Sequence, residues 1–341
     1  MKCVSPIKNN LNPNKYIKAQ RGAPKVLITG GAGFIGSNLA RALLNTGAEV
    51  FVVDNLITGR LQNVLPLKKA KRFHFFEMDV TQDSFLKKFS KIQLNQIYHL
   101  ACPTGVPNIK KLGEEMLLTC SIGTRNALEL CRVHGAKFLV TSSSEIYGAA
   151  DTPVQAESYE GRVNPVGVRS AYEEGKRFTE ALVIHYVRKY RVDADIVRLF
   201  NTYGPGMSPV DQRVIPRFLR SLKNGRPLTI YGNGEQKRTF LFIDDLISAL
   251  TLVMAKGGRG EVYNIGGPNP VTIKELAQLI CNMVDGSPDI HFVPHFIEDH
   301  DYRKPLLTKI RRLGWRQTVL LRNGLRRMME MDHFKPRGFV G

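Results

Sequence analysis

Short apolar runs and longer amphipathic stretches alternate along most of the chain. The short runs have the length of buried parallel strands. In the longer stretches apolar residues recur every three or four positions, as on a helix that buries one face. The expected strands are KVLI (25–28), EVFVVD (49–54), RFHFFEMDV (72–80), QIYHLAC (96–102) and AKFLVTSSS (136–144). This alternation predicts an α/β fold, a Rossmann-type doubly wound parallel sheet with helices on both faces.

The pattern changes after residue 204. The later stretches predict a helix and a short strand over 211–232, a strand and a helix that return to the main sheet over 239–257, and another strand and helix over 261–284. We therefore expect a Rossmann domain over 23–204, to which residues 237–265 return, and a smaller interleaved C-terminal α/β domain over most of 205–341. Because ligands commonly lie in clefts between such parts, we expect the substrate there.

Composition is that of an ordinary globular protein. Hydrophobic residues make up 43% and charged residues 23% of the 341 residues, which is enough to build a core. The apolar run LISALTLVMA (246–255) is too short to span a bilayer, so no membrane partner is expected. Residues 1–22 are rich in Lys, Asn and Pro and predict a flexible basic leader, not a secretory signal. Five cysteines without a C-x-x-C motif favour free thiols in a reducing cytoplasm and no metal site.

The net charge of +19 is unusually high. Such a charge is typical of proteins that bind nucleic acid. The lysines and arginines are nevertheless scattered in short clusters such as KKAKR (68–72) and LKKFSK (86–91), and none alternates with aromatic residues as a base-stacking surface would. We therefore expect a basic cleft for anionic phosphates on a generally basic surface, and no nucleic-acid partner.

A glycine triplet follows the first strand. Gly30, Gly33 and Gly36 open an amphipathic helix, which is the arrangement that a tight turn, a bound pyrophosphate and close helix–strand packing require. Asp54 ends the second strand, where it can accept a hydrogen bond from a ribose 2′-hydroxyl, so NAD is favoured, although the nearby Arg60 leaves NADP open. A glycine turn without a ligand is disfavoured because strand, triplet, helix, strand and acid occur in this order.

The other expected cofactor contacts lie at the start of the first helix and at the ends of the following strands. They are Phe34, Ile35, Asn55, Asp79, Val80, Leu100 and Ala101.

The fifth strand and a later helix carry the candidate chemistry. TSSSEIYG (141–148) puts hydroxyls and a carboxylate at the end of the strand. A Ser-rich turn that only caps a helix would show the same sequence pattern. In SAYEEGKRF (170–178), the helical period puts Tyr172 and Lys176 one turn apart on one face. An ammonium lowers the pKa of a nearby phenol, and a nicotinium would lower it further, so Tyr172 can serve as a base. The charged residues off this face are expected to be solvated or packed in a dimer interface: Glu173, Glu174 and Arg177.

The glycine triplet, the Ser-rich fifth strand and the Tyr-x-x-x-Lys pair together resemble the extended short-chain dehydrogenase/reductase superfamily, also called the NAD-dependent epimerase/dehydratase family. Within it, the chain is similar to the UDP-glucuronate decarboxylases. The segments that carry this likeness are DNLITGR (54–60), HLACP (99–103), TSSSEIYG (141–148), NPVGVRSAYEEGKR (164–177), RLFNTYGPGM (198–207), LTIYGNGEQKRTF (228–240) and RKP…LGW (303–315).

The resemblance implies roles for particular residues. Ser143, Tyr172 and Lys176 would handle the proton at sugar C4 while NAD⁺ takes the hydride. The 4-keto sugar would then lose CO₂ and be reduced again, so that UDP-glucuronate becomes UDP-xylose with NAD recycled. Further catalytic residues would be Ser144, Glu145 and Arg238. The nucleotide-sugar would contact Asn201, Arg213, Tyr231, Arg238 and Arg303, and a homodimer is expected.

The chain departs from the pattern of the decarboxylases at several positions near the substrate. Ile109 and Lys111 replace tyrosines, Cys120 replaces an asparagine, Gly206 an arginine and Leu306 an aspartate. A nucleotide-sugar 4,6-dehydratase or a 4-epimerase therefore remains an alternative. Glu145 argues against the epimerase, which needs no acid there. An NAD-binding scaffold without activity is a third alternative, and the intact catalytic set argues against it.

Overall fold

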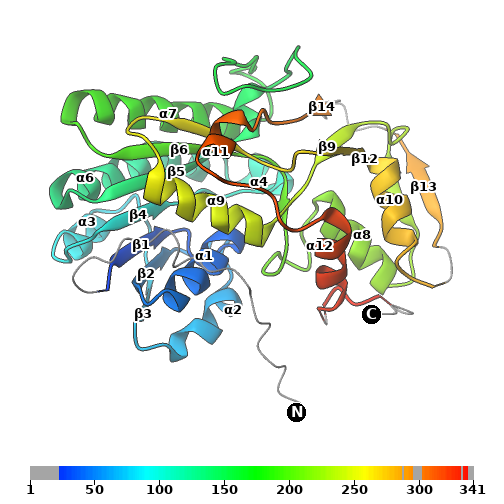
Figure 1. Cartoon of the computed structure of the whole chain (residues 1–341), viewed down its shortest axis with the longest axis horizontal. Coiled ribbons are helices and arrows are strands. Elements are labelled where there is room, and N and C mark those ends of the chain that lie inside the picture. The colour runs from blue at the N-terminus through cyan, green and yellow to red at the C-terminus, as the bar shows by residue number, and fades with distance from the viewer. Residues whose placement is uncertain (1–22, 286–287, 295–301, 332, 337–341) are drawn as a thin grey trace.

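The computed structural model describes residues 23–285, 288–294, 302–331 and 333–336 (Figure 1). The expected leader over 1–22 lies outside these residues. No helix in the described part of the chain is both long and apolar enough to cross a membrane.

Seven parallel strands form the central sheet, in the order β11-β6-β5-β4-β1-β2-β3. The strands are β1 (Lys25–Thr29), β2 (Glu49–Asp54), β3 (Phe73–Glu77), β4 (Gln96–His99), β5 (Lys137–Ser143), β6 (Ala194–Leu199) and β11 (Val262–Ile265). The five strands predicted from the sequence are all present, and the predicted fold class is confirmed. The order reverses between β1 and β4, so a ligand crevice is expected at the carboxyl ends of these two strands.

Helices cover both faces of this sheet (Figure 1). The main ones are α1 (Phe34–Asn45), α3 (Asp83–Phe89), α6 (Thr124–His134), α7 (Ser170–Tyr190) and α9 (Ile243–Lys256). Val26 and Ile28 of β1 point into the core on the α1 and α9 side, while Leu27 points into the core on the α3, α6 and α7 side. Successive residues of a strand face opposite sides, so two apolar layers explain why these strands are almost continuously hydrophobic.

Several short helical elements connect the strands. They are α2 (Leu61–Val64), η2 (Leu65–Lys69), α4 (Val106–Lys111), α5 (Gly113–Leu118), η3 (Thr119–Gly123), η4 (Ser144–Tyr147) and α11 (Thr308–Arg312). After α4, the elements α5, η3 and α6 follow one another in succession. The middle element, η3, has π-helical geometry, in which each hydrogen bond spans one extra residue.

The C-terminal part is built from small sheets and helices at one end of the molecule (Figure 1). β8 (Leu228–Tyr231) pairs with β13 (Ile290–Val293), and β9 (Lys237–Thr239) lies between β12 (Pro270–Thr272) and β14 (Tyr302–Arg303). The helices are α8 (Val214–Lys223), α10 (Ile273–Cys281) and α12 (Leu321–Met329).

The return of residues 237–265 to the main sheet is less complete than predicted. Helix α9 contacts β5, and β11 is an edge strand of the sheet. β9 joins the three-stranded sheet instead, and β10 (Leu241–Phe242) pairs only with β7 (Thr202–Tyr203). These strands have two or three residues each, so the pattern of apolar residues in them was too short to predict their partners.

Candidate active site

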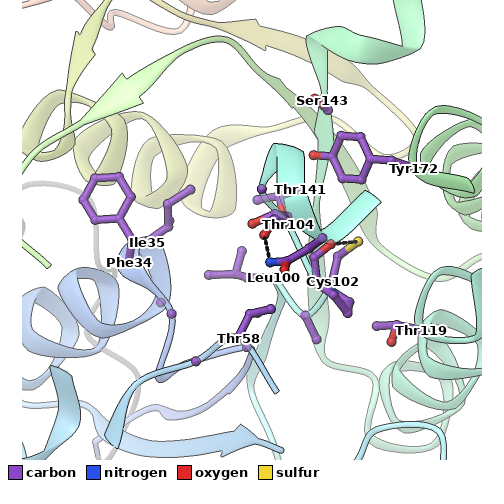
Figure 2. Close-up of a pocket in the computed structure, with 18 of the residues that line it drawn as sticks. Phe34, Ile35, Thr58, Leu100, Cys102, Thr104, Thr119, Thr141, Ser143 and Tyr172 are labelled. Carbon is purple, nitrogen blue, oxygen red and sulfur yellow. Dashed lines mark hydrogen bonds between the residues drawn. The ribbon is translucent and has the colours of Figure 1, made fainter. Parts of the chain in front are cut away.

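A cleft of about 630 Å³ opens at the carboxyl ends of β1, β4 and β5. Every residue predicted to bind the cofactor lines it, as do Ser143, Ser144 and Glu145. Figure 2 shows Tyr172 and Ser143 on one wall of this cleft, with Phe34 and Ile35 across from them. The topological switch point of the sheet and the predicted residues therefore coincide in space.

The glycine turn at the floor of the cleft tolerates no larger residue. Gly30 has a φ of +69°, and a Cβ there would lie 2.7 Å from the backbone nitrogen of Ala101. A Cβ on Gly36 would lie 2.4 Å from the carbonyl oxygen of Gly30. The backbone thus packs tightly enough to bring the N-terminus of α1 to the cleft, where its free N–H groups can bind a phosphate.

Asp54 stabilises this turn through two hydrogen bonds from backbone N–H groups. Its Oδ2 accepts a hydrogen bond from the N–H of Ala32 at 2.9 Å, and its Oδ1 accepts one from the N–H of Leu56 at 2.9 Å. Burial raises the pKa of the carboxyl, and these backbone donors oppose the rise. Each carboxylate oxygen has a second lone pair, so Asp54 can still accept a ribose hydroxyl. Its position is fixed by the loop it holds.

Lys176 lies beneath the cleft, almost fully buried. Its Nζ donates a hydrogen bond to the carbonyl oxygen of Thr141 at 2.9 Å. Burial disfavours the ammonium, but Cys102, Cys120 and Tyr172 outweigh burial and raise the pKa of Lys176. The lysine is therefore a fixed cation one helical turn from the phenol.

The pKa of Tyr172 is raised overall, whereas the sequence predicted that it would be lowered. Burial raises it, while Lys176 and a hydrogen bond with Ser143 lower it by a smaller amount. The ammonium can be read from the sequence, but the loss of water around a phenol enclosed by the folded chain cannot.

Two arginines hold Glu145 between them. Arg303 Nη1 lies 2.9 Å from Glu145 Oε1 and also reaches Ser144 Oγ at 3.5 Å. Arg169 Nη2 pairs with Glu145 Oε2, and Arg169 Nε lies 3.1 Å from Glu173. Glu173 is thus buried and paired, which corrects the prediction that it is solvated or in a dimer interface. Burial and the charge of Glu145 raise the pKa of Glu173, and Arg169 opposes that rise.

Arg169 was missed by the sequence analysis. It lies in NPVGVRSAYEEGKR, three residues before Tyr172, and it lines the cleft. The available signal was its position directly before the N-terminus of α7, on the same side as the tyrosine.

A second cavity of about 180 Å³ adjoins the cleft and shares Asn201 and Arg213 with it. Tyr231 and Arg238 also line this cavity, so the structure brings four of the five predicted substrate residues together there. Arg238 thus lies beside the predicted nucleotide site. Arg303, which is its register partner across β9 and β14, reaches Glu145. Arg217, which the sequence analysis missed, lies over the Tyr231 ring at 4.4 Å.

The positions that depart from the decarboxylase pattern are dispersed around the site. Ile109 and Gly206 line the cleft, and Cys120 lies against Cys102 beside Lys176. Leu306 is exposed on the surface.

Comparisons with known proteins give consistent relationships. The model of the NAD dependent epimerase/dehydratase family matches residues 26–266. UDP-glucuronic acid decarboxylase 1 of Arabidopsis thaliana is 40% identical over 306 residues, which are 89% of this chain and 69% of the relative. UDP-glucuronic acid decarboxylase 1 of Xenopus tropicalis is 37% identical over 94% of this chain and 76% of the relative.

Solved structures agree with this relationship. The UDP-glucose 4-epimerase of Thermotoga maritima, solved with UDP-glucose, superposes with a TM-score of 0.83 at 28% identity, covering 90% of this chain and 97% of that one. DesIV of Streptomyces venezuelae, a dTDP-glucose 4,6-dehydratase solved with NAD, superposes with a TM-score of 0.78 at 30% identity, covering 88% and 94%. The fold, the cleft at the switch point and these matches agree, and the chain belongs to the NAD dependent epimerase/dehydratase family.

Proposed function

We propose that this enzyme is a UDP-glucuronate decarboxylase that forms UDP-xylose and CO₂. The observation that carries the proposal is the pair of Arg169 and Glu145 in the cleft wall beside Tyr172 and Ser143. A charged pair next to the acid–base tyrosine can meet the carboxylate on C5 of a sugar whose C4 hydroxyl lies at the tyrosine. An epimerase substrate with a neutral sugar has no need of it.

The residues that would hold NAD are those of the glycine turn and Asp54, and the tight packing at Gly30 and Gly36 fits a dinucleotide. NAD held there would supply the hydride chemistry at C4 of the sugar. Tyr172 takes the proton of the C4 hydroxyl, and Ser143 shares the hydrogen bond to that oxygen. Oxidation makes a β-keto acid, whose C5–CO₂ bond breaks with its electron pair moving toward the ketone.

The negative charge that develops on the C4 oxygen needs donors close by. Tyr172 and Ser143 supply them in a site where Lys176 is a permanent cation. Glu145, positioned by Arg169 and Arg303, lies at the end of β5 where a proton can be relayed to C5. Return of the Tyr172 proton to the C4 oxygen would complete the reaction once C4 is reduced again.

The nucleotide would lie toward the second cavity. Tyr231, with Arg217 over its ring, forms an aromatic and cationic wall there, and Asn201 and Arg213 join that wall to the cleft. This placement makes the C-terminal part a nucleotide-sugar domain and gives Arg238 a binding role.

The proposal predicts that purified enzyme given UDP-glucuronate releases CO₂ and forms UDP-xylose without net NADH. The products can be measured by mass spectrometry and the cofactor by NADH fluorescence. Formation of UDP-galacturonate, or of a 6-deoxy-4-keto sugar from another nucleotide-sugar, with UDP-glucuronate untouched, would show an epimerase or a dehydratase instead.

Lys176→Met is predicted to move the acidic limb of the pH–rate profile to higher pH. The ammonium lowers the pKa of Tyr172, so its removal raises that pKa, and more alkaline solution is then needed to form the phenolate. The measurement is kcat as a function of pH. Lys189→Met, an exposed lysine on the same helix, is the matched control and should keep the wild-type profile. An unshifted profile for Lys176→Met would remove the lysine from this role.

We also propose a homodimer in a reducing compartment, the cytoplasm. Large apolar side chains are exposed on α5, η3 and α7, which pack together. They are Leu117, Leu118, Ile122 and Phe178. Such a contiguous apolar face is typical of an interface. The reducing compartment is supported by Cys102, Cys120, Cys131 and Cys281, which are all unbridged.

Phe178→Arg is predicted to convert the dimer into a monomer, because a guanidinium would be buried at the centre of this face. Size-exclusion chromatography with light scattering measures the mass. Leu320→Arg, at another exposed leucine, should leave the dimer intact. A wild-type chain that is already monomeric would exclude this interface.

A further inference from the structure

Two cysteines face each other behind the catalytic lysine. Cys102 follows β4 and lines the cleft, while Cys120 lies in the π-helical turn η3 and is only 2% exposed. Their sulfurs are 3.7 Å apart and hydrogen-bonded, and the proton can be on either one. Figure 2 shows Cys102 on the cleft wall. The proposed reaction uses neither thiol.

Lys176 gives this pair the charge state of a reactive dithiol. The hydrogen bond from Cys102, assisted by Lys176 and opposed by burial, lowers the pKa of Cys120 to about 6. The same hydrogen bond and burial raise the pKa of Cys102. A thiolate on Cys120 beside a thiol on Cys102 is therefore the favoured charge state of the pair. A thiolate beside a second thiol is the arrangement that thiol–disulfide exchange requires.

We propose that Cys102 and Cys120 form a redox modification site that closes into an intramolecular disulfide and inactivates the enzyme. The co-reactant is a low-molecular-weight disulfide that enters by the cleft. The shared proton passes to Cys120, and Cys102, the accessible sulfur, attacks one sulfur of that disulfide as the thiolate, which displaces one thiolate and leaves a mixed disulfide. The displaced thiolate takes the proton of Cys120, and Cys120 then attacks Cys102 and displaces the second thiolate. Two protein sulfurs are oxidised, and the added disulfide is reduced to one thiol and one thiolate, which carry away the proton and the negative charge of the pair.

Formation of the disulfide must move residues that pack against α7, the helix that carries Tyr172. A disulfide bond is about 2 Å long, so the sulfurs have to approach well beyond their present 3.7 Å. A Cβ on Gly175 of α7 would lie 3.3 Å from Cys120 Sγ, and Thr179 of α7 donates to the carbonyl oxygen of Cys120 at 3.0 Å. A shift of Cys120 is therefore passed to the helix that carries Tyr172.

Closure also removes the negative charge beside Lys176, since neither sulfur of a disulfide is ionised. Cys120 lies in a π-helical turn, and such turns occur often at functional sites. Displacement and charge loss both act on the tyrosine–lysine pair, so the oxidised enzyme should lose turnover.

The test is incubation of the holoenzyme in mixtures of reduced and oxidised glutathione. Trypsin separates the two cysteines, so the disulfide appears in a mass spectrum as peptide 92–110 joined to peptide 112–125. As this cross-link forms, kcat should fall about a hundredfold, the loss that a displacement of about 1 Å can cause, and dithiothreitol should restore it. The cross-link is read by mass, so it tests the site even if UDP-glucuronate is not the substrate.

Cys102→Ser should form no cross-link and keep, under oxidation, the activity it has without oxidant, because Cys120 is only 2% exposed. Cys281→Ser, at a buried cysteine on α10, should remain as sensitive as the wild type. The proposal is overturned if oxidised glutathione produces no such cross-link, if cross-linked enzyme turns over normally, or if Cys102→Ser is inactivated to the same extent. If the serine variant does not fold, the mass spectrum and the activity of the oxidised wild-type enzyme still test the proposal.

Discussion

Tyr172→Phe is expected to lower kcat by about a thousandfold, the middle of the range for loss of a positioned acid–base group, while NAD stays bound. Phenylalanine keeps the buried ring and its packing but cannot take the proton of the C4 hydroxyl or donate to the C4 oxygen. Because both oxidation and re-reduction at C4 need that proton, NADH and CO₂ should both form about a thousandfold more slowly. Single-turnover kinetics with UDP-glucuronate measure the rate of the chemical steps. The NAD content of the purified variant shows whether the cofactor is still bound.

Tyr186→Phe is the matched control for this prediction. Tyr186 lies on the same helix, and its hydroxyl donates to Glu129 at 2.7 Å, away from the cleft. Its loss should cost about 1 kcal/mol of stability and leave kcat near the wild-type value. If Tyr172→Phe turned over as fast as Tyr186→Phe, the base would have to be another group.

Glu145→Gln is expected to separate C4 oxidation from decarboxylation. The amide has the shape of the carboxylate but leaves Arg169 and Arg303 without their shared anion. Both the charged pair that meets the C5 carboxylate and the group that relays the C5 proton are then lost. We expect release of CO₂ to fall by about a hundredfold or more, while mixing with UDP-glucuronate still produces NADH through Tyr172. Fluorescence of bound NADH and trapping of ¹⁴CO₂ follow the two steps separately.

Stability should also respond to this change. Removing one partner of a buried ion pair typically costs about 3–5 kcal/mol of stability. The loss should be smaller here, because Glu145 is only partly buried and Arg169 keeps its ion pair with Glu173. Glu174→Gln removes an exposed glutamate paired with Arg177 and should change neither step. If CO₂ release by Glu145→Gln were as fast as by Glu174→Gln, Glu145 would have no part in the chemistry.

Features that depend on neighbours in the sequence were predicted well. The central strands follow from short apolar runs, and Tyr172 and Lys176 follow from the helical period, since residues four apart must share a face. The glycine turn follows because a backbone with a φ of +69° between β1 and α1 favours glycine. In each case the constraint acts within one element or between two consecutive ones.

Features that depend on distant segments were missed or reversed. Glu145, Arg169 and Arg303 come from a strand end, a helix start and a C-terminal strand, up to 158 positions apart. The register of β9 and β14 decides that Arg303 contacts Glu145.

The sequence by itself determined the parallel sheet, its glycine turn and the spacing of the tyrosine and lysine, because these are encoded by periodicity and by backbone sterics. Only the tertiary structure decided which charges meet at the end of β5, that burial raises the pKa of Tyr172, and that two thiols 18 positions apart approach to 3.7 Å. Burial and cross-element contacts depend on how the completed elements pack, and no local pattern specifies that packing.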